Sequence, residues 1–359
     1  MTVTMSDLLR FAVEQGASDV HISSGDRPAL RLHGDMHRID HPALTRAETH
    51  SLIFEIMTDA QRRSFQERLE VDFAFKLDET LRFRVNAFVQ NRGEGAVLRH
   101  IPSKIPSMSE LGLPATLNHF CRQPRGLVLV TGPTGSGKST TLAAMVDSIN
   151  TTSAVHILTL EDPIEFVHRP KRAFINQREV GSQTHSFKNA LRSALREDPD
   201  IILVGELRDH ESISLALTAA ETGHLVFATL HTASAPKTVD RIIDVFPANQ
   251  QPQVRAMLSE SLLGVVTQTL LRRKTGGRVA GLEVLVATPA VRNLIREAKT
   301  HQLPSIMQVG ASAGMQTMES ALVELVKDGV ITPQVAAESV PESHVLASMV
   351  PPTKLAKAV

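Results

Sequence analysis

The sequence of 359 residues contains one cysteine, Cys121, and neither tryptophan nor tyrosine. A single thiol excludes an internal disulfide framework and fits a protein of a reducing cytoplasm. Lysine and arginine together number 38, as do aspartate and glutamate, so the formal net charge at pH 7 is zero. Because nucleic-acid affinity arises from an excess of cationic side chains, the composition offers no reason to expect nucleic acid as the main partner.

Long hydrophobic runs are also missing. No stretch reaches the roughly 18 apolar residues from which a membrane-spanning helix is recognised. The start of the chain, MTVTMSDLLR, includes an acidic residue and lacks the apolar core of a signal peptide. We therefore expect a cytoplasmic chain without a membrane span, which reaches a membrane only through a partner.

Proline content and strand pattern divide the chain into two domains joined by a linker. Residues 1–100 predict a small α+β domain, and residues 115–340 predict an α/β domain. Between them, residues 101–114 contain three prolines and little periodicity, which is typical of a linker. The weak periodicity of residues 341–359 predicts a flexible tail.

The first domain alternates short strands with polar helices. Ser6 is the expected cap of its first helix, over 6–16. Thr45 and Glu48 have capping-box spacing, which predicts one helix from Thr45 to about Leu69. Strands are expected in the remaining apolar stretches, at 19–23, on both sides of a turn at Gly34-Asp35, and as three strands within 71–101.

The second domain has near-continuous apolar runs, which are typical of strands covered on both faces. These runs lie at 126–130, 155–160, 200–206 and 224–230, and helical segments separate them at 138–150, 186–197 and 209–221. The alternation predicts a parallel sheet with helices on both sides. Residues 250–340 are expected to be mostly helical.

A glycine-rich stretch follows the first of these strands. GPTGSGKS matches the phosphate-loop pattern G-x-x-x-x-G-K-[ST], in which backbone N–H groups and a helix N-terminus bind phosphate oxygens. Lys138 is expected to reach the β- and γ-phosphates of ATP, and Ser139 to ligate Mg²⁺. The predicted nucleotide contacts here are Gly132, Pro133, Thr134, Gly135, Ser136, Gly137, Lys138, Ser139 and Thr140.

An acidic residue, Glu206, ends the strand in DPDIILVGELRD. This is the place of a Walker B acid, because ligands of open α/β sheets bind at the carboxyl ends of the strands. We expect Glu206 to act in catalysis and at Mg²⁺, although Gly205 stands where an aspartate is usual. An ion pair between Glu206 and Arg208 is the alternative interpretation.

A second acidic group, in LTLEDPIEF, comprises Glu161, Asp162 and Glu165. Three acids near phosphates repel them unless a metal ion or an attacking water explains the acids. Glu165 is therefore the candidate general base, and Glu161 and Asp162 are candidate nucleotide contacts. A solvated loop with a capping side chain is the alternative.

Two histidines, His224 and His231, flank the strand in GHLVFATLHT. A histidine at the carboxyl end of a strand can contact phosphates or sense their loss. The alternative is a core strand whose histidines are satisfied by hydrogen bonds within the fold.

The first domain supplies several arginines, at Arg82, Arg84, Arg92 and Arg99. In ring ATPases an arginine from a neighbouring subunit often stabilises charge in the transition state. The alternative is an ordinary solvated strand face.

Several long motifs are more specific than a phosphate loop alone: FRVNAFVQNRGEGAVLR (83–99), ILTLEDPIEF, DPDIILVGELRD, TAAETGHLVFATLHT (218–232) and TPAVRNLIREAKTHQ (288–302). With them the chain resembles the type IV pilus retraction ATPases, the PilT family within the secretion ATPases. The resemblance implies a PAS-like N-terminal domain, a RecA-like ATPase domain and a homohexamer at the cytoplasmic face of the inner membrane. ATP hydrolysis would power pilus retraction and twitching motility by acting on a membrane-embedded platform protein.

Roles for single residues follow from the same resemblance. Glu165 corresponds to the catalytic glutamate of the family, and Glu206 to its Walker B glutamate, next to a glycine that is normal there. His224 and His231 correspond to the family's His box. Arginines that the family presents to nucleotide correspond to Arg82, Arg84 and Arg99.

Rival functions remain at this point. Extension and type II secretion ATPases usually carry a paired CxxC zinc module, which one cysteine cannot build. A closer rival is an accessory, PilU-like retraction ATPase that modulates a sister motor, or a subunit that binds nucleotide without hydrolysing it. The segment AVRNLIRE (290–297) favours the principal retraction motor. A nucleic-acid motor is disfavoured by the balanced charge.

Overall fold

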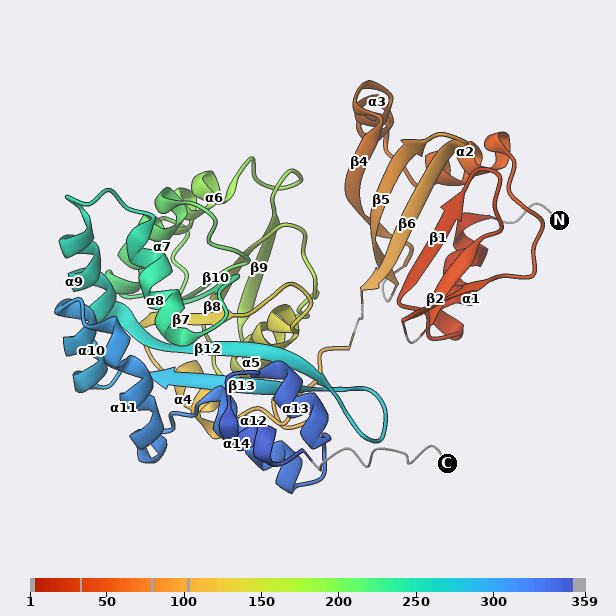
Figure 1. Ribbon diagram of the computed structural model, residues 1–359. Coiled ribbons are helices and arrows are strands. Elements are labelled where there is room, and N and C mark those ends of the chain that lie inside the picture. The colour runs from red at the N-terminus through yellow and green to blue at the C-terminus, as the bar shows by residue number, and fades with distance from the viewer. Residues whose placement is uncertain (1–3, 33, 79–80, 102–103, 351–359) are drawn as a thin grey trace, which may run out of the picture. The chain divides into compact units, whose positions relative to one another are not determined.

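The computed structural model describes residues 4–32, 34–78, 81–101 and 104–350, which fold as two compact units (Figure 1). The division lies between Lys104 and Ile105, inside the segment predicted as the linker. Each unit has its own sheet and its own hydrophobic core.

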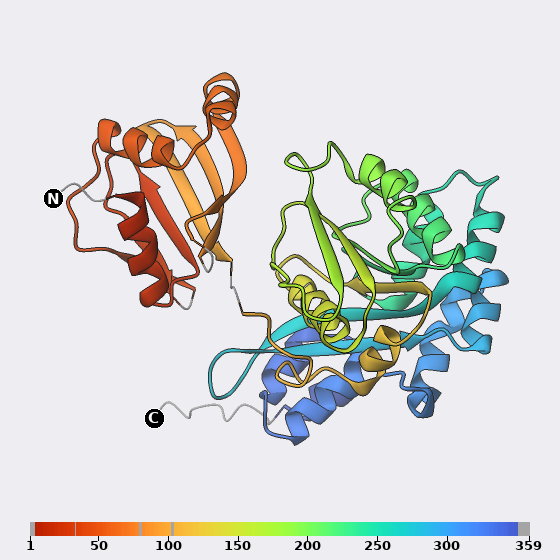
Figure 2. The same ribbon diagram turned by 180° about the vertical axis from the view of Figure 1, so that it is seen from behind.

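Unit 1 is a six-stranded antiparallel sheet in the order β3-β2-β1-β6-β5-β4, with helices packed on one face. Figure 2 shows α1 in front of this sheet. In chain order its elements are α1 (Met5–Glu14), β1 (Asp19–Ser23), β2 (Ala29–Leu32), β3 (Asp35–Arg38), α2 (Arg46–Glu55), α3 (Asp59–Arg68), β4 (Glu70–Lys76), β5 (Arg82–Gln90) and β6 (Gly93–Ile101).

Two helix predictions for unit 1 are corrected by the capping contacts. Thr4, not Ser6, caps α1, because the Thr4 hydroxyl accepts a hydrogen bond from the backbone N–H of Asp7. The single helix predicted up to Leu69 is two helices, since Thr58 begins α3 with a capping box of its own. The predicted capping box at Thr45 is present.

Unit 2 is a seven-stranded sheet in the order β13-β12-β7-β11-β10-β8-β9. Its strands are β7 (Gly126–Thr131), β8 (His156–Glu161), β9 (Phe174–Glu179), β10 (Ile201–Val204), β11 (Leu225–Leu230), β12 (Leu262–Arg272) and β13 (Arg278–Val286). Its α-helices are α4 (Ala115–Cys121), α5 (Lys138–Thr152), α6 (Phe187–Ala194), α7 (His210–Glu221), α8 (Ala235–Asp244), α9 (Gln251–Ser261), α10 (Pro289–Arg296), α11 (Leu303–Val309), α12 (Met318–Lys327), α13 (Pro333–Ser339) and α14 (His344–Ser348).

The sheet of unit 2 is mixed, which corrects the prediction of a purely parallel sheet. β12 continues the parallel set beside β7, and β13 returns antiparallel at the edge. The hairpin lies within 250–340, where mostly helix was expected. Its β-branched residues Val265, Val266 and Thr267 favour a strand over a helix. β9 was also not anticipated.

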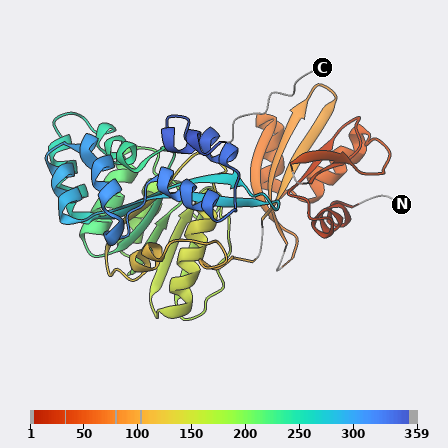
Figure 3. The same ribbon diagram turned by 60° about the horizontal axis from the view of Figure 1, so that its bottom comes forward.

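Two helical layers bury the faces of this sheet, as the apolar runs predicted. α4 and α5 contribute Phe120, Met145 and other residues to the core on one face, and α6 to α11 cover the opposite face. A smaller cluster joins α12, α13 and α14 to the β12–β13 hairpin (Figure 3).

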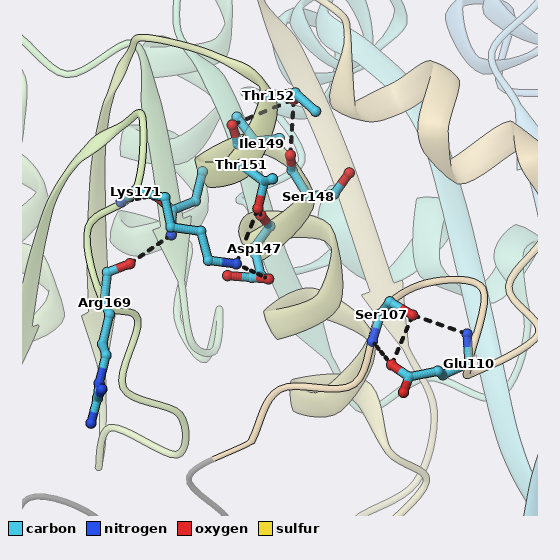
Figure 4. Close-up of polar contacts among 10 residues, drawn as sticks. Ser107, Glu110, Asp147, Ser148, Ile149, Thr151, Thr152, Arg169 and Lys171 are labelled. Carbon is cyan, nitrogen blue, oxygen red and sulfur yellow. Dashed lines mark hydrogen bonds and ion pairs between the residues drawn. The ribbon is translucent and has the colours of Figure 1, made fainter.

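Described residues of the segments predicted as linker and tail pack within unit 2. The hydroxyl of Ser107 donates to Glu110 Oε2 at 2.8 Å and accepts from the Glu110 N–H at 3.2 Å (Figure 4). This closes a turn that buries Met108 in the core beside α5. Within the predicted tail, α14 buries Leu346, and residues 351–359 lie outside the described part of the chain.

Within the described ranges, no helix is both long enough and apolar enough to span a bilayer.

Candidate nucleotide-binding site

The phosphate-loop sequence lies between β7 and α5, at the carboxyl edge of the sheet. β7 ends at Thr131 and α5 begins at Lys138, so the helix N-terminus faces the loop. Gly132 has a φ of 136°, and a Cβ there would lie 2.2 Å from the carbonyl oxygen of Gln268. Only glycine therefore allows the chain to leave β7 and bend into the loop.

Lys138 is the cation at the centre of this loop. Its side chain is buried, and its Nζ donates to the carbonyl oxygens of Gly132 at 2.9 Å and Pro133 at 3.0 Å. Burial lowers the pKa of the Lys138 ammonium, and the negative charges of Glu206 and Glu165 oppose that shift. Both acids therefore lie close enough to Lys138 to act on its charge.

Glu206 follows β10 at the same edge and contacts two side chains, those of His231 and Arg208. Its Oε1 is 3.2 Å from His231 Nε2, and its Oε2 accepts from Arg208 Nε at 2.8 Å. The alternative pairing with Arg208 is thus present together with the contact to His231. These three side chains make a polar cluster beside the phosphate loop.

Gly205, the unexpected residue before Glu206, has a packing explanation. A Cβ at this position would lie 3.2 Å from the carbonyl oxygen of Leu160 and 3.3 Å from the Cα of Glu161. The carbonyl of Gly205 also accepts a hydrogen bond from the Thr229 hydroxyl. β8 therefore approaches too closely to accommodate an aspartate here without a shift.

Glu161 is directed into the fold, which corrects its assignment as a nucleotide contact. Its Oε1 accepts from the Thr159 hydroxyl at 2.6 Å and from Gln177 Nε2 at 3.1 Å, and its Oε2 from the Glu165 N–H at 3.4 Å. Burial raises the pKa of Glu161, although these hydrogen bonds oppose the shift. Glu161 therefore positions the loop that carries the exposed Glu165.

Two further residues of this region differ in their surroundings. Asp162, the other predicted contact, is exposed. Glu179 was not anticipated, and it anchors the same loop because its Oε2 accepts from the Ile164 N–H at 3.0 Å. Glu179 lies outside the acidic motif in sequence, so no sequence pattern indicated this contact.

The two histidines lie at opposite edges of the sheet, which corrects the assignment of both to one site. His231 follows β11 at the carboxyl edge and meets Glu206. His224 precedes β11, at the start of β7, and its Nδ1 is 3.0 Å from the carbonyl oxygen of Ala219. The six residues of β11 lie between them, and seven steps at about 3.3 Å each separate them by roughly 23 Å. His224 is thus the hydrogen-bonded histidine of the alternative interpretation.

The arginines of unit 1 lie on the sheet face opposite the helices. Arg84 and Arg99 are exposed and stand directly opposite each other on β5 and β6. Arg99 Nε donates to Asp19 Oδ1 at 2.8 Å. Arg82 is half-buried, and its Nε has no hydrogen-bond partner among the described residues. Like charges placed opposite each other repel, and the ion pair of Arg99 with Asp19 offsets part of that repulsion.

A cavity of 210 Å³ adjoins the phosphate loop within unit 2. Leu113, Leu270 and Val279 supply apolar lining, and Arg273 and Arg278 supply charge. Thr140, Thr141 and Gln268 also line the cavity, so its wall mixes apolar and polar side chains. The hairpin and the turn at Ser107–Glu110, which form much of this wall, were not recognised in the sequence.

Comparisons with known proteins agree with this geometry. Residues 2–338 match the family described as Type II/IV secretion system protein. The type IV pilus retractation ATPase PilT of Pseudomonas aeruginosa is 58% identical over 341 residues, which cover 94% of this chain and 99% of that protein. The type IV pilus ATPase PilU of the same organism is 42% identical over 326 residues, covering 90% and 85%.

A solved structure is also similar. The crystal structure of the pilus retraction motor PilT with bound ADP superposes with a TM-score of 0.89 at 48% identity, covering 94% of this chain and 97% of that one.

Proposed function

This chain belongs to the type II/IV secretion system protein family, and on that premise we propose that it hydrolyses ATP to retract a type IV pilus. The observation that carries the proposal is the buried Lys138 of an intact phosphate loop with Glu165 and Glu206 as its neighbours. An anionic ligand would meet the Lys138 ammonium and the N-terminus of α5 at this sheet edge, and the two acids would be available to Mg²⁺ or to an attacking water. The similarity to PilT along nearly the whole chain is the reason for proposing pilus retraction as the work that hydrolysis drives.

Within one subunit, the reaction divides among the residues at the carboxyl edge. Lys138 leaves the carbonyls of Gly132 and Pro133 to contact the β- and γ-phosphates. Glu165, which is exposed and hydrogen-bonded through its backbone to Glu161, orients the attacking water and accepts its proton. His231, in contact with Glu206, senses the γ-phosphate and its loss.

Mg²⁺ fits the donor set of this site. It usually takes one or two protein oxygen ligands and completes its shell with phosphates and water. Ser139, in the first turn of α5, and Glu206 supply such oxygens, and within the described ranges no cluster of three metal-binding side chains competes. The bound ion would neutralise charge that develops on the phosphates.

The arginines act on the nucleotide of a neighbouring subunit in this proposal. Arg84 and Arg99 are exposed and stand side by side on β5 and β6. A transition-state arginine contributes about 10³–10⁵ in rate where it has been measured. The active form is then a homohexamer of RecA-like ATPase domains and PAS-like N-terminal domains. It works on a platform protein at the cytoplasmic face of the inner membrane.

An accessory PilU-like role is less well supported, because identity to PilU is lower than identity to PilT from the same organism. Every residue proposed for hydrolysis is also present in this chain. A purified chain that hydrolyses ATP without a sister motor would separate the two roles.

A mixing experiment tests the shared site. Lys138→Ala removes the phosphate lysine, and the pair Arg84→Ala with Arg99→Ala removes the donated arginines. Each variant alone is expected to be nearly inactive, but mixed rings regain turnover because one subunit supplies an intact loop and its neighbour supplies arginines. ATPase rate and ring mass by light scattering are the measurements.

The matched control is Arg38→Ala, on the edge strand β3 of the same sheet, where Arg38 pairs with Asp26 at 3.2 Å. This variant is expected to turn over normally. A mixture that stays inactive while both variants still form rings would disprove donation between subunits.

A further inference from the structure

We infer that Gln268 is a positioning residue that holds the phosphate loop in its ligand-binding shape. It lies on β12, 132 residues from Ser136 in the loop that it contacts. The inference rests on the proposed nucleotide function, and it assigns to β12 a role in that function.

Strand register brings Gln268 to the loop. Thr267 pairs with Thr131, the last residue of β7, so Gln268 is level with Gly132, where the loop begins. The hydroxyls of Thr267 and Thr131 meet at 2.9 Å on one face of the sheet. Because side chains alternate along a strand, Gln268 points to the other face, toward α5.

The side chain of Gln268 makes two buried hydrogen bonds, one to each end of the loop–helix junction. Its Nε2 donates to the carbonyl oxygen of Ser136 at 2.7 Å, and its Oε1 accepts from the Thr141 hydroxyl at 2.8 Å. Gln268 is 2% exposed and Thr141 is 1% exposed. The Ser136 carbonyl can only accept, so it fixes which end of the amide faces the loop.

These contacts determine where the loop N–H groups point. A phosphate loop binds through several backbone N–H groups at once, so a small rotation of one peptide misaligns its neighbours. The bond to Ser136 holds the peptide just before Gly137 and Lys138, and the bond to Thr141 holds the first turn of α5. The backbone carbonyl of Gln268 also packs against Gly132, where it leaves no room for a side chain.

The chemistry of this position requires both a donor and an acceptor. Methionine has a similar volume and supplies neither, so Gln268→Met leaves the Ser136 carbonyl and the Thr141 hydroxyl buried without a partner. The loop then turns these groups toward other partners and loses its preorganised shape. Ligand binding must afterwards restore that shape, which weakens affinity.

The experiment compares nucleotide affinity with stability in the full-length chain. Fluorescent ADP binding is measured by anisotropy, melting temperature is measured without nucleotide, and KM and kcat are measured for ATP. Gln268→Met is expected to weaken ADP binding and to raise KM about ten-fold, the equivalent of about one buried hydrogen bond. At saturating ATP, kcat is expected to change less than KM, because the groups proposed for chemistry are intact.

The matched control is Gln316→Met. Gln316 Nε2 also donates to a backbone carbonyl, that of Leu282 at 2.9 Å, and Leu282 pairs with Gln268 across the hairpin. Both variants lose an amide contact, which is buried for Gln268 and part-buried for Gln316, and both are expected to melt at lower temperature. Only Gln268→Met is expected to lose ADP affinity.

A gentler variant, Thr141→Val, removes one of the two bonds with little change of shape. It is expected to weaken ADP binding about three-fold, and it keeps the inference testable if Gln268→Met does not fold. Equal ADP affinity in Gln268→Met and Gln316→Met, or unchanged affinity in Thr141→Val, would overturn the inference. A wild-type chain that binds no ADP at all would instead contradict the proposed function.

Discussion

The carboxyl and amino edges of the unit 2 sheet carry similar polar side chains, but these side chains have different surroundings at the two edges. At the amino edge these groups bond to the fold itself. His224 Nδ1 contacts the carbonyl of Ala219, and Asp200 Oδ2 accepts from the His156 N–H at 2.8 Å. Lys171 Nζ donates to Asp147 at 2.7 Å near the end of α5 (Figure 4).

At the carboxyl edge the polar side chains cluster beside the phosphate loop. Lys138, Glu206 and His231 lie together there, and Glu165 is exposed beside them. Residue type therefore does not distinguish a functional histidine, acid or lysine from a structural one in this sheet. Strand direction does, because ligands of such sheets bind at the carboxyl ends.

The lysine pair gives the largest expected difference between the two edges. Lys138→Ala removes the cation that we propose faces the phosphates and is expected to abolish ATP turnover, with ATP affinity reduced about 100-fold. Calorimetric titration and a phosphate-release assay measure both effects.

The amino-edge lysine is the control for that experiment. Lys171→Ala breaks an exposed ion pair and is expected to cost at most about 1 kcal/mol of unfolding free energy, with normal turnover. Equal loss of ATP binding in the two variants would remove the distinction between the edges.

The acid pair separates chemistry from binding. Glu165→Gln keeps the shape of the loop but removes the proton acceptor, so kcat is expected to fall about 10²–10⁴-fold while ATP affinity is retained. Asp200→Asn, at the amino edge, is expected to retain turnover. Single-turnover kinetics with a parallel binding assay measure the two quantities, and normal turnover in Glu165→Gln would exclude its role as base.

Sequence spacing was sufficient for part of this site. The glycine and lysine pattern and the apolar strands predicted the loop, its flanking elements and the neighbourhood of Lys138 and Glu206, because these depend on local order and strand direction. The inward turn of Glu161 and the bracing by Gln268 depend on partners that only the sheet order brings close. No single-sequence pattern specifies which strand pairs with which.

The hairpin formed by β12 and β13 shows the same limit. Its β-branched residues Val265, Val266 and Thr267 are compatible with a strand, but helical segments flank the hairpin on both sides. Pairing with β7 then decided the conformation, because it buries Val265 and Val266 on opposite faces of a growing sheet.

The histidine pair gives a smaller and more discriminating difference. His231→Gln removes the group in contact with Glu206 and is expected to lower kcat about 10- to 100-fold. His224→Gln replaces a side chain bonded only to the fold and is expected to stay within about two-fold of wild type. A pH–rate profile of both variants checks the assignment, and a larger loss in His224→Gln would restore it to the site.

The smallest expected effect concerns the segment between β8 and β9, which connects the two edges of the sheet. Because β8 and β9 are parallel, residues 162–173 run from the carboxyl edge back to the amino edge. His168 lies buried on that path, and burial lowers its pKa from 6.5 to about 4. Its Nδ1 has no hydrogen-bond partner within the described ranges. The folded protein therefore keeps His168 neutral where the unfolded chain binds a proton.

Stability should accordingly fall as the pH drops below 6.5, with the loss complete only near pH 4. Between pH 7.5 and 5.5 this histidine is expected to cost about 1.4 kcal/mol of unfolding free energy. Urea unfolding of wild type and His168→Gln at the two pH values isolates the contribution, since other groups titrate alike in both. An unchanged pH dependence in His168→Gln would mean that the connection opens to water at His168 and that burial does not hold it neutral.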